Sequence, residues 1–125
     1  MTKVVKSEDW GNSPKNIFVQ DLTIALIDGD LKLIMDSVTE DVRWNIVGDI
    51  LLQGKNSITE NLKRKKERPL ELTIHHVATH GKAGAVNGSW KMKSGKMIEF
   101  CNIYVFGNTK WTVVSEITAY EIETR

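Results

Sequence analysis

Three polar side chains stand in otherwise apolar, strand-like stretches of this 125-residue chain and could act together in chemistry. Asn102 interrupts the apolar run at 99–106 (EFCNIYVF), where a buried amide without a partner would cost about 1–3 kcal/mol. An amide N–H can also polarise a carbonyl or hold an enolate-like oxygen. Glu116 and His76 can both move a proton. These residue types together indicate acid–base chemistry on a carbonyl compound.

Alternation along a strand decides which of these side chains share a face. Counting every second residue places each candidate in an apolar row. The rows are Phe100, Asn102 and Tyr104; Val114, Glu116 and Thr118; and Leu72, Ile74 and His76. Asn102 therefore has two interpretations, a polar group that faces a pocket or a buried amide that bonds Glu116, Tyr104 or the backbone.

The elements that must carry these residues fall into two halves. Helix signals come first: Ser13-Pro14 begins a helix that ends at Asp28, Asp30 caps a short helix over 31–37, and Ser57 with Glu60 forms a capping box. One strand is expected at 42–47. From residue 70 the apolar period changes to two, and further strands are predicted near 70–79, 83–93, 96–106 and 110–122. Helices followed by an antiparallel meander indicate an α+β fold.

Length and composition describe one ordinary globular domain. With 41% hydrophobic and 26% charged residues, the chain can bury a core without disulfides, and its single cysteine fits a reducing compartment. We expect a lead-in at 1–12 and one domain at 13–125. A net charge of +1 gives no reason to expect nucleic acid as a partner. No apolar run suits a signal peptide or a membrane span, so we predict a cytoplasmic protein without a membrane partner.

Three stretches of the chain show a likeness to a known superfamily. IDGDLKLIMDSVTEDVRWNIVG suits helix, Gly-Asp, helix, acidic turn and strand; GKNSITENL begins a helix with Gly-x-x-x-Ile; and IYVFGNTKW is an aromatic-x-aromatic turn between strands. In this order, over roughly residues 14–122, they resemble the nuclear transport factor 2-like (NTF2-like), or SnoaL-like, superfamily of cystatin-like folds. The resemblance implies three N-terminal helices on a strongly curved, mainly antiparallel sheet that forms a cone with a central pocket.

The resemblance also implies which side chains face that pocket. Asn102 falls at a position similar to that of a protonated aspartate in ketosteroid isomerases of the superfamily. Glu116 falls at a position similar to that of an aspartate in its epoxide hydrolases. The expected ligand-binding walls are Trp44, Ile46, Trp90, Phe100, Tyr104, Val114 and Thr118.

The chain departs from both of these known sites. Leu22 stands where the isomerases have a tyrosine, and Asn45 or Ile46 stands where they have the base. No inward arginine completes the epoxide hydrolase site, because Arg43 alternates out of phase with Trp44. Neither steroid isomerisation nor epoxide hydrolysis is therefore predicted.

The opposite row of the sheet is apolar as well, and the resemblance implies that this convex face forms a homodimer. The residues expected there are Cys101, Ile103, Val105, Val113 and Ile117. No metal or other cofactor is expected, because His75 and His76 are adjacent on a strand and diverge, and no cysteine or acidic ligand is near them in sequence.

Three hypotheses about function remain. The leading one is the binding of a small, largely apolar, oxygen-bearing molecule in the cone. The second is an isomerase, cyclase or dehydratase in which Glu116 or His76 moves a proton without a metal while Asn102 holds the oxygen. The third is a dimeric assembly module without chemistry. Whether the chain is an enzyme is left open.

Overall fold

The computed structural model describes residues 2–7, 13–64 and 67–124, so Trp10 and part of the expected lead-in lie outside it. The helices are α1 (Pro14–Asp28), α2 (Leu31–Ser37) and α3 (Lys55–Arg64). The strands are β1 (Lys3–Val5), β2 (Val38–Ile46), β3 (Ile50–Gln53), β4 (Glu71–His80), β5 (Ala83–Lys91), β6 (Met97–Phe106) and β7 (Val114–Thr124). The predicted order of helices followed by a strand meander is confirmed.

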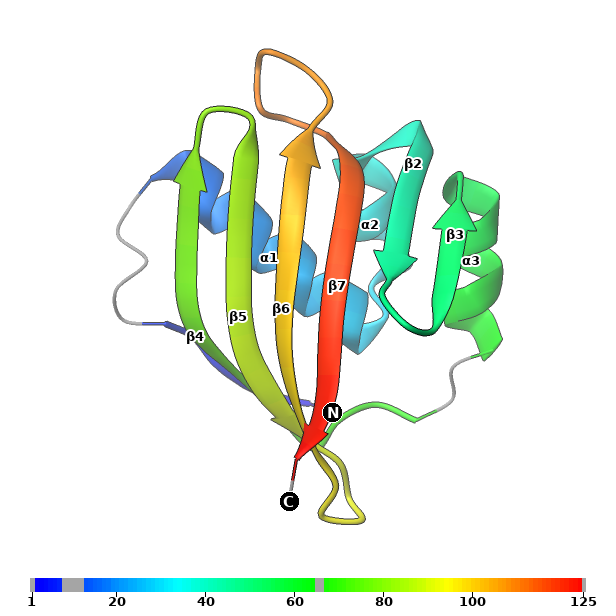
Figure 1. Ribbon diagram of the computed structural model, residues 1–125, viewed down its shortest axis with the longest axis vertical. Helices are drawn as coiled ribbons and strands as arrows, with labels where there is room; N and C mark the ends of the chain where they lie inside the picture. The colour runs from blue at the N-terminus through cyan, green and yellow to red at the C-terminus, as the bar shows by residue number, and fades with distance from the viewer. Residues whose placement is uncertain (1, 8–12, 65–66, 125) are drawn as a thin grey trace.

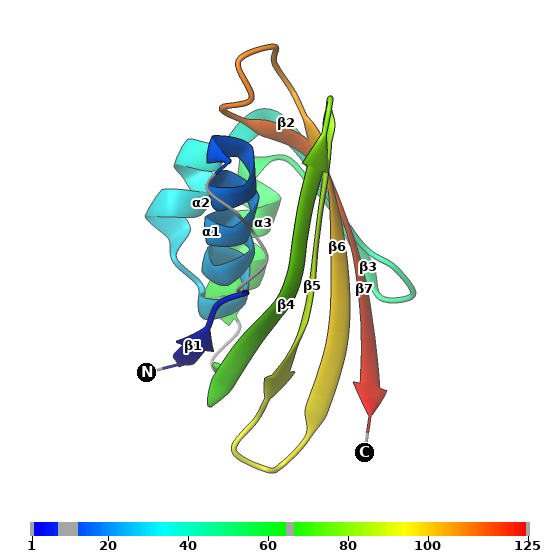
Figure 2. The same ribbon diagram turned by 90° about the vertical axis from the view of Figure 1, so that its left-hand side faces the viewer.

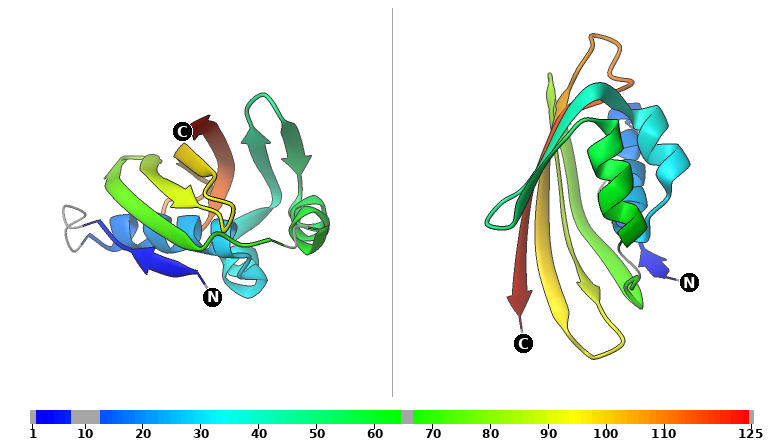
Figure 3. Two further views of the ribbon diagram at one scale, coloured as in Figure 1. Left: turned by 90° about the horizontal axis from the view of Figure 1, so that it is seen from below. Right: turned by 90° about the vertical axis from the view of Figure 1, so that its right-hand side faces the viewer.

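The strands form one seven-stranded sheet in the order β1-β4-β5-β6-β7-β2-β3 (Figure 1). Its pairs are antiparallel except β1–β4 and β2–β7, which are parallel. All three helices lie against one face of this curled, unclosed sheet, as Figures 2 and 3 show. We call the face toward the helices the inner face and the other the outer face. The predicted α+β fold is therefore correct.

The ends of the first two helices follow their sequence signals. The Ser13 side chain accepts a hydrogen bond from the N–H of Asn16 at 3.5 Å, with Pro14 as the first helical residue. Asp30 caps α2 by accepting from the N–H of Leu33 at 3.2 Å. Gly29, between the helices, adopts a left-handed conformation with φ of 81°. Local chemistry thus determines where α1 and α2 begin.

Three expectations about the elements need correction. The third helix begins at Lys55, directly after Gly54, so Ser57 lies inside it and does not cap it. Residues 3–5, which belong to the expected lead-in, form β1 and pair with the edge of β4. Residues 50–53 form β3, which pairs with β2. Both unpredicted strands are too short to show alternation in the sequence.

Two irregularities in strand pairing decide which side chains face the helices. The register between β4 and β5 shifts between Ile74 and His76. The register between β6 and β7 shifts where Val105 pairs with Glu116 but Phe106 pairs with Val114. A bulge inserts one residue into a strand and so reverses the alternation beyond it.

The core lies between the inner face and the helices. It includes Val19, Leu22 and Leu26 from α1, which are almost fully buried, as are Ile58 and Leu62 from α3. Among the described residues, no helix is long and apolar enough to cross a membrane.

Gly88, in β5 beside the β4 bulge, is required by close backbone packing. A Cβ at this position would overlap the carbonyl oxygen of Thr73 and approach the Cα of Ile74 at 3.1 Å. Because backbone atoms must move, we expect Gly88→Ala to lower the free energy of unfolding by about 1–3 kcal/mol, measured by urea denaturation. Gly84→Ala is the control, since the closest neighbours of its Cβ would be side-chain methyl groups of Val19 and Thr79 at 3.1 and 3.2 Å, and the nearest backbone atom would be at an ordinary contact distance of 3.7 Å. Equal losses in both variants would contradict this account.

Candidate functional site

Asn102 lies on the inner face, 4% exposed, and its hydrogen-bond partner is Tyr104. Asn102 Nδ2 donates to the Tyr104 hydroxyl at 3.1 Å. The Tyr104 and Thr23 hydroxyls lie 2.5 Å apart, and Thr23 Oγ1 donates to the carbonyl oxygen of Val19 at 2.7 Å. Since the Thr23 proton is used on Val19, the Tyr104 hydroxyl must donate to Thr23. The result is a directed chain from the amide in β6 to the backbone of α1, which supports the buried-amide interpretation.

This hydrogen-bond chain uses Asn102, the residue that the enzyme hypothesis assigned to hold the substrate oxygen. The Tyr104 O–H is committed to Thr23, and one N–H of Asn102 is committed to Tyr104. Burial raises the pKa of Tyr104 to about 12, and the hydrogen bonds that Tyr104 makes with Thr23 and Asn102 only partly oppose that rise. Tyr104 is therefore a neutral structural phenol at physiological pH.

Glu116 lies on the outer face and not beside Asn102. It pairs with Val105 and is exposed, whereas Val114 and Ile117 are buried on the inner face. The bulge at Ser115 separates Val114 from Glu116 and reverses the alternation that the sequence pattern assumed. For the same reason Thr118 lies on the outer face and Ile117 on the inner face, the reverse of what the sequence predicted.

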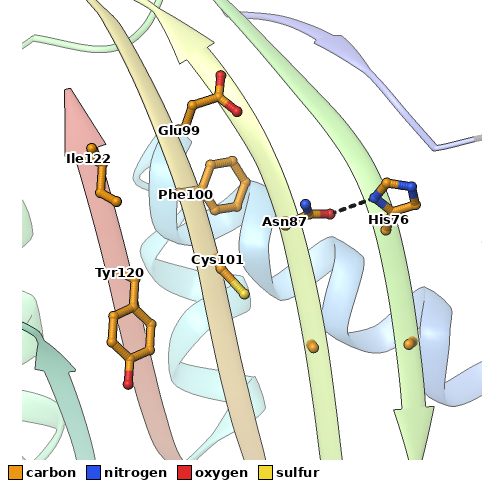
Figure 4. A pocket seen from close by; sticks show the side chains of 9 residues that line it. His76, Asn87, Glu99, Phe100, Cys101, Tyr120 and Ile122 are labelled. Atoms are coloured by element: carbon orange, nitrogen blue, oxygen red, sulfur yellow. Dashed lines mark hydrogen bonds between the residues drawn. The ribbon is translucent and has the colours of Figure 1, made fainter. Parts of the chain in front are cut away.

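His76 also lies on the outer face, as Figure 4 shows. The bulge after Ile74 ends its expected phase with Leu72 and Ile74, and Val77 takes the buried position in its place. His76 Nδ1 and Asn87 Oδ1 are 3.0 Å apart, and because a carbonyl oxygen only accepts, Nδ1 carries the proton. The three proposed catalytic residues are thus divided between the two faces of the sheet.

The outer face carries a groove of about 460 Å³ that includes His76, Asn87, Cys101 and Tyr120 (Figure 4). These four residues form one row across neighbouring strands. Neighbouring strands are about 4.8 Å apart, so His76 and Cys101 are separated by roughly 10 Å and cannot act as a nucleophile and its base. Burial raises the pKa of the Cys101 thiol, which also disfavours a nucleophilic role.

The remaining expected wall residues lie on the inner face. Trp44, Trp90, Phe100, Tyr104 and Val114 are buried there, and Ile46 is partly buried. The rings of Trp90 and Phe100 pack with their centroids 5.4 Å apart. Around Asn102 the core is filled, since Leu22, Val86 and Ile117 are at most 1% exposed.

Two neighbouring hollows open at the end of the inner face that is farthest from Phe106. The mouth hollow, about 310 Å³, has apolar walls of Ile27, Pro69, Trp90, Met92 and Ile98 and a charged rim of Asp49, Glu67, Lys96 and Glu121. The side hollow, about 280 Å³, is lined by Ile46, Asp49, Ile50, Asn61, Arg64 and Glu121. Asp49 and Glu121 border both. This arrangement can accommodate an apolar body and supply polar contacts at its edge.

Comparisons with known proteins bear on the architecture. No protein-family model matches the chain, and no curated protein matches it. An NTF2-like protein of unknown function from Cytophaga hutchinsonii matches with a TM-score of 0.67 and 20% identity, over 86% of this chain and 99% of that one. Another from Burkholderia xenovorans matches with a TM-score of 0.75 and 14% identity, over 89% and 84%. An LEH-like epoxide hydrolase from Mycobacterium tuberculosis gives 0.69 and 16%, over 86% and 82%.

The chain has the NTF2-like fold. Other neighbours of this fold carry SnoaL-like names, which agrees with the resemblance found in the sequence motifs. At 20% identity and below, these matches establish the NTF2-like architecture alone.

Several residues that shape the hollows in this NTF2-like fold were not found from sequence. Glu121 lies on the inner face because it pairs with Phe100, and it occupies the kind of position expected of Glu116. Asp49 lies in the turn between β2 and β3, and β3 was not predicted. Thr23 is fully buried, and its hydroxyl in a mostly apolar helix stripe was a sequence signal that went unused.

The buried phenol makes the stability of the fold sensitive to alkaline pH. The folded-state pKa of Tyr104, about 12, lies above the value of 10 for an unperturbed tyrosine. Between these values the unfolded chain has lost the proton that the folded chain keeps, so the free energy of unfolding should fall as pH rises, by about 1 kcal/mol per pH unit. Urea denaturation at pH 9 and 11 should show this fall in the wild type.

Tyr104→Phe should lower the free energy of unfolding at pH 9, because Asn102 and Thr23 lose their partner. Between pH 9 and 11 the free energy of unfolding of this variant should decrease less than that of the wild type, because the phenol is gone. The control is Tyr120→Phe, which removes a half-exposed phenol from the outer face and should keep the decrease that Tyr104 causes. An unchanged alkaline fall in Tyr104→Phe would contradict the assignment.

Proposed function

We propose that the protein binds a small, largely apolar molecule with one or two oxygen functions in the mouth hollow. The observation that carries the proposal is the pairing of apolar walls, led by Trp90 and Ile98, with a rim of charged side chains in about 310 Å³. Small-molecule sites typically occupy about 300–1,000 Å³ and combine such walls with a few polar groups. The side hollow adds room on the far side of Asp49 and Glu121.

The rigidity of one wall supports this proposal. Trp90 packs on Phe100 at 5.4 Å, and both rings are largely buried. A wall that is already ordered loses little conformational entropy when a ligand binds. Met92 and Ile98 are partly buried beside it and can adjust to the shape of the ligand.

Binding is favoured over the proton-transfer hypothesis because of where the proposed catalytic groups lie. Glu116 and His76 are on the opposite side of the sheet from Asn102, so no substrate can touch Asn102 together with either of them. A neighbour of the same fold is named as an epoxide hydrolase, but a shared fold does not transfer chemistry. In an enzyme built on the mouth hollow, one of the charged rim residues, such as Asp49 or Glu121, would have to move the proton.

A thermal-shift screen of small aromatic and terpenoid ketones, esters and alcohols should find binders. Ile98→Trp should weaken their binding at least tenfold, because the larger side chain fills the mouth hollow. Ile122→Trp is the matched control: Ile122 is 64% exposed on the outer face, and binding should be unchanged. The absence of binders across the panel, or equal binding by wild type and Ile98→Trp, would refute the proposal.

We also propose that the outer face forms a homodimer. Cys101, Ile103 and Val105 point to this face, together with Tyr120 and Ile122, which are 48% and 64% exposed. Apolar side chains exposed in one patch favour association. Two members of the expected dimer face are excluded from this proposal: Ile117 is 1% exposed on the inner face, and Val113 precedes β7. We also propose that the protein is located in the cytoplasm, as its sequence predicts.

Light scattering should report a dimer for the wild type and a monomer for Ile103→Arg, because the guanidinium would be desolvated at the interface. Ile17→Arg places the same change on the exposed side of α1, where Ile17 is 37% exposed, and should stay dimeric. A monomeric wild type would refute this proposal and would leave ligand binding untouched.

A further inference from the structure

The groove on the outer face has small side chains in one part and large, projecting ones in another. Ala78 and Ala85 are cross-strand neighbours in β4 and β5, and both line the groove. Because their side chains end at Cβ, we call this part of the groove the recess. Tyr120 and Ile122 border the same groove from β7 and are 48% and 64% exposed, so both project from the sheet (Figure 4).

The exposed border of the groove favours a second sheet face over a small molecule as its occupant. Small-molecule sites typically bury about 70–90% of the ligand surface. Here Ala78, Tyr120 and Ile122 are all exposed, and the three helices lie against the other face of the sheet (Figure 2). A small molecule in this groove would stay in contact with water, whereas another broad sheet face would cover it.

Sheet packing requires large side chains of one face to meet small ones of the other. Two sheets that pack face to face lie about 10 Å apart, and their side chains interdigitate. A tyrosine side chain spans more than half of that distance, so it fits only where the facing sheet has short side chains, as at Ala78 and Ala85. In a two-fold dimer the same patch meets itself, and each contact is made twice. A patch with both a projection and a recess is therefore complementary to a second copy of itself.

Tyr120 suits the recess better than Ile122 does, because the groove is polar on one side. His76 and Asn87 line that side and are joined by the hydrogen bond of 3.0 Å. A phenol combines an apolar ring with a hydroxyl that can donate and accept. The ring can cover the two alanines while the hydroxyl reaches the His76–Asn87 pair, and isoleucine has no group that could do so.

We infer that the two copies of the homodimer interlock, and that Tyr120 of each copy lies in the recess of the other, over Ala78 and Ala85. The inference rests on the proposed homodimer. It adds the contact that fixes how the two copies are placed on each other. It also implies that dimer formation covers Cys101, which lines the same groove.

The test uses two variants that damage opposite halves of the contact. Tyr120→Ala removes the projection, and Ala85→Phe fills the recess. Each should raise the dimer dissociation constant at least tenfold, measured by sedimentation equilibrium. An equal mixture of the two variants should form a heterodimer at least tenfold tighter than either homodimer, identified by its mass in native mass spectrometry. In that heterodimer one tyrosine meets an open recess, and the added phenylalanine faces the position of the missing tyrosine.

Ile122→Ala is the matched control for this rescue. It removes another exposed side chain from the same strand and the same face, but it does not empty the position that the added phenylalanine enters. Its mixture with Ala85→Phe should form no heterodimer tighter than the Ile122→Ala homodimer. Equal rescue by Tyr120→Ala and by Ile122→Ala would overturn the inference.

Two failures can be told apart. If the wild type is monomeric, the proposed homodimer fails and the inference fails with it. If the wild type is a dimer but either variant dimerises within threefold of it, or the mixture shows no rescue, the inference alone is overturned. The copies then meet in another arrangement.

A second measurement needs no variant, because Cys101 is the single cysteine of the chain. N-ethylmaleimide should modify Cys101 at least tenfold more slowly at protein concentrations well above the dimer dissociation constant than at concentrations well below it. The reason is that the second copy covers the groove only in the dimer. Equal labelling rates in monomer and dimer would overturn the inference.

Discussion

The buried hydrogen-bond chain from Asn102 through Tyr104 and Thr23 to the carbonyl of Val19 joins the middle of the sheet to α1. Each donor on this path is inaccessible to water, so the cost of leaving one unpaired holds α1 at a fixed height above β6. The same side chains fill the space where a central pocket was expected. The hollows are therefore displaced to the far end of the inner face, beside Trp90.

The sequence was most informative where local chemistry decides the outcome. Serine and aspartate caps, and the change of period at residue 70, were enough to predict α1, α2 and the strand meander. The central position of Asn102 on the inner face also followed from alternation with Phe100 and Tyr104. Within one regular strand, every second residue does share a face.

The predicted faces of Glu116, Thr118 and His76 were wrong because two strands must accommodate each other there. Whether β7 bulges at Ser115, and β4 after Ile74, depends on pairing with β6 and β5, which the sequence of one strand does not contain. A single inserted residue moved Glu116 and Thr118 outward and brought Ile117 inward. The partner of Asn102 lies 81 residues from Thr23, so the complete chain of bonds could be found only in three dimensions.

The two short strands at the margins of the sheet limit edge-to-edge aggregation of the protein. An unpaired strand edge is a template on which further chains can add, and β4 would present ten residues of such an edge. β1 covers part of it with three residues, and at the other margin β3 offers only four. Open-ended growth of one sheet onto another is thereby discouraged at both ends. The proposed contact between copies then falls on the outer face, the broad face that the helices do not cover, where an assembly can close on itself.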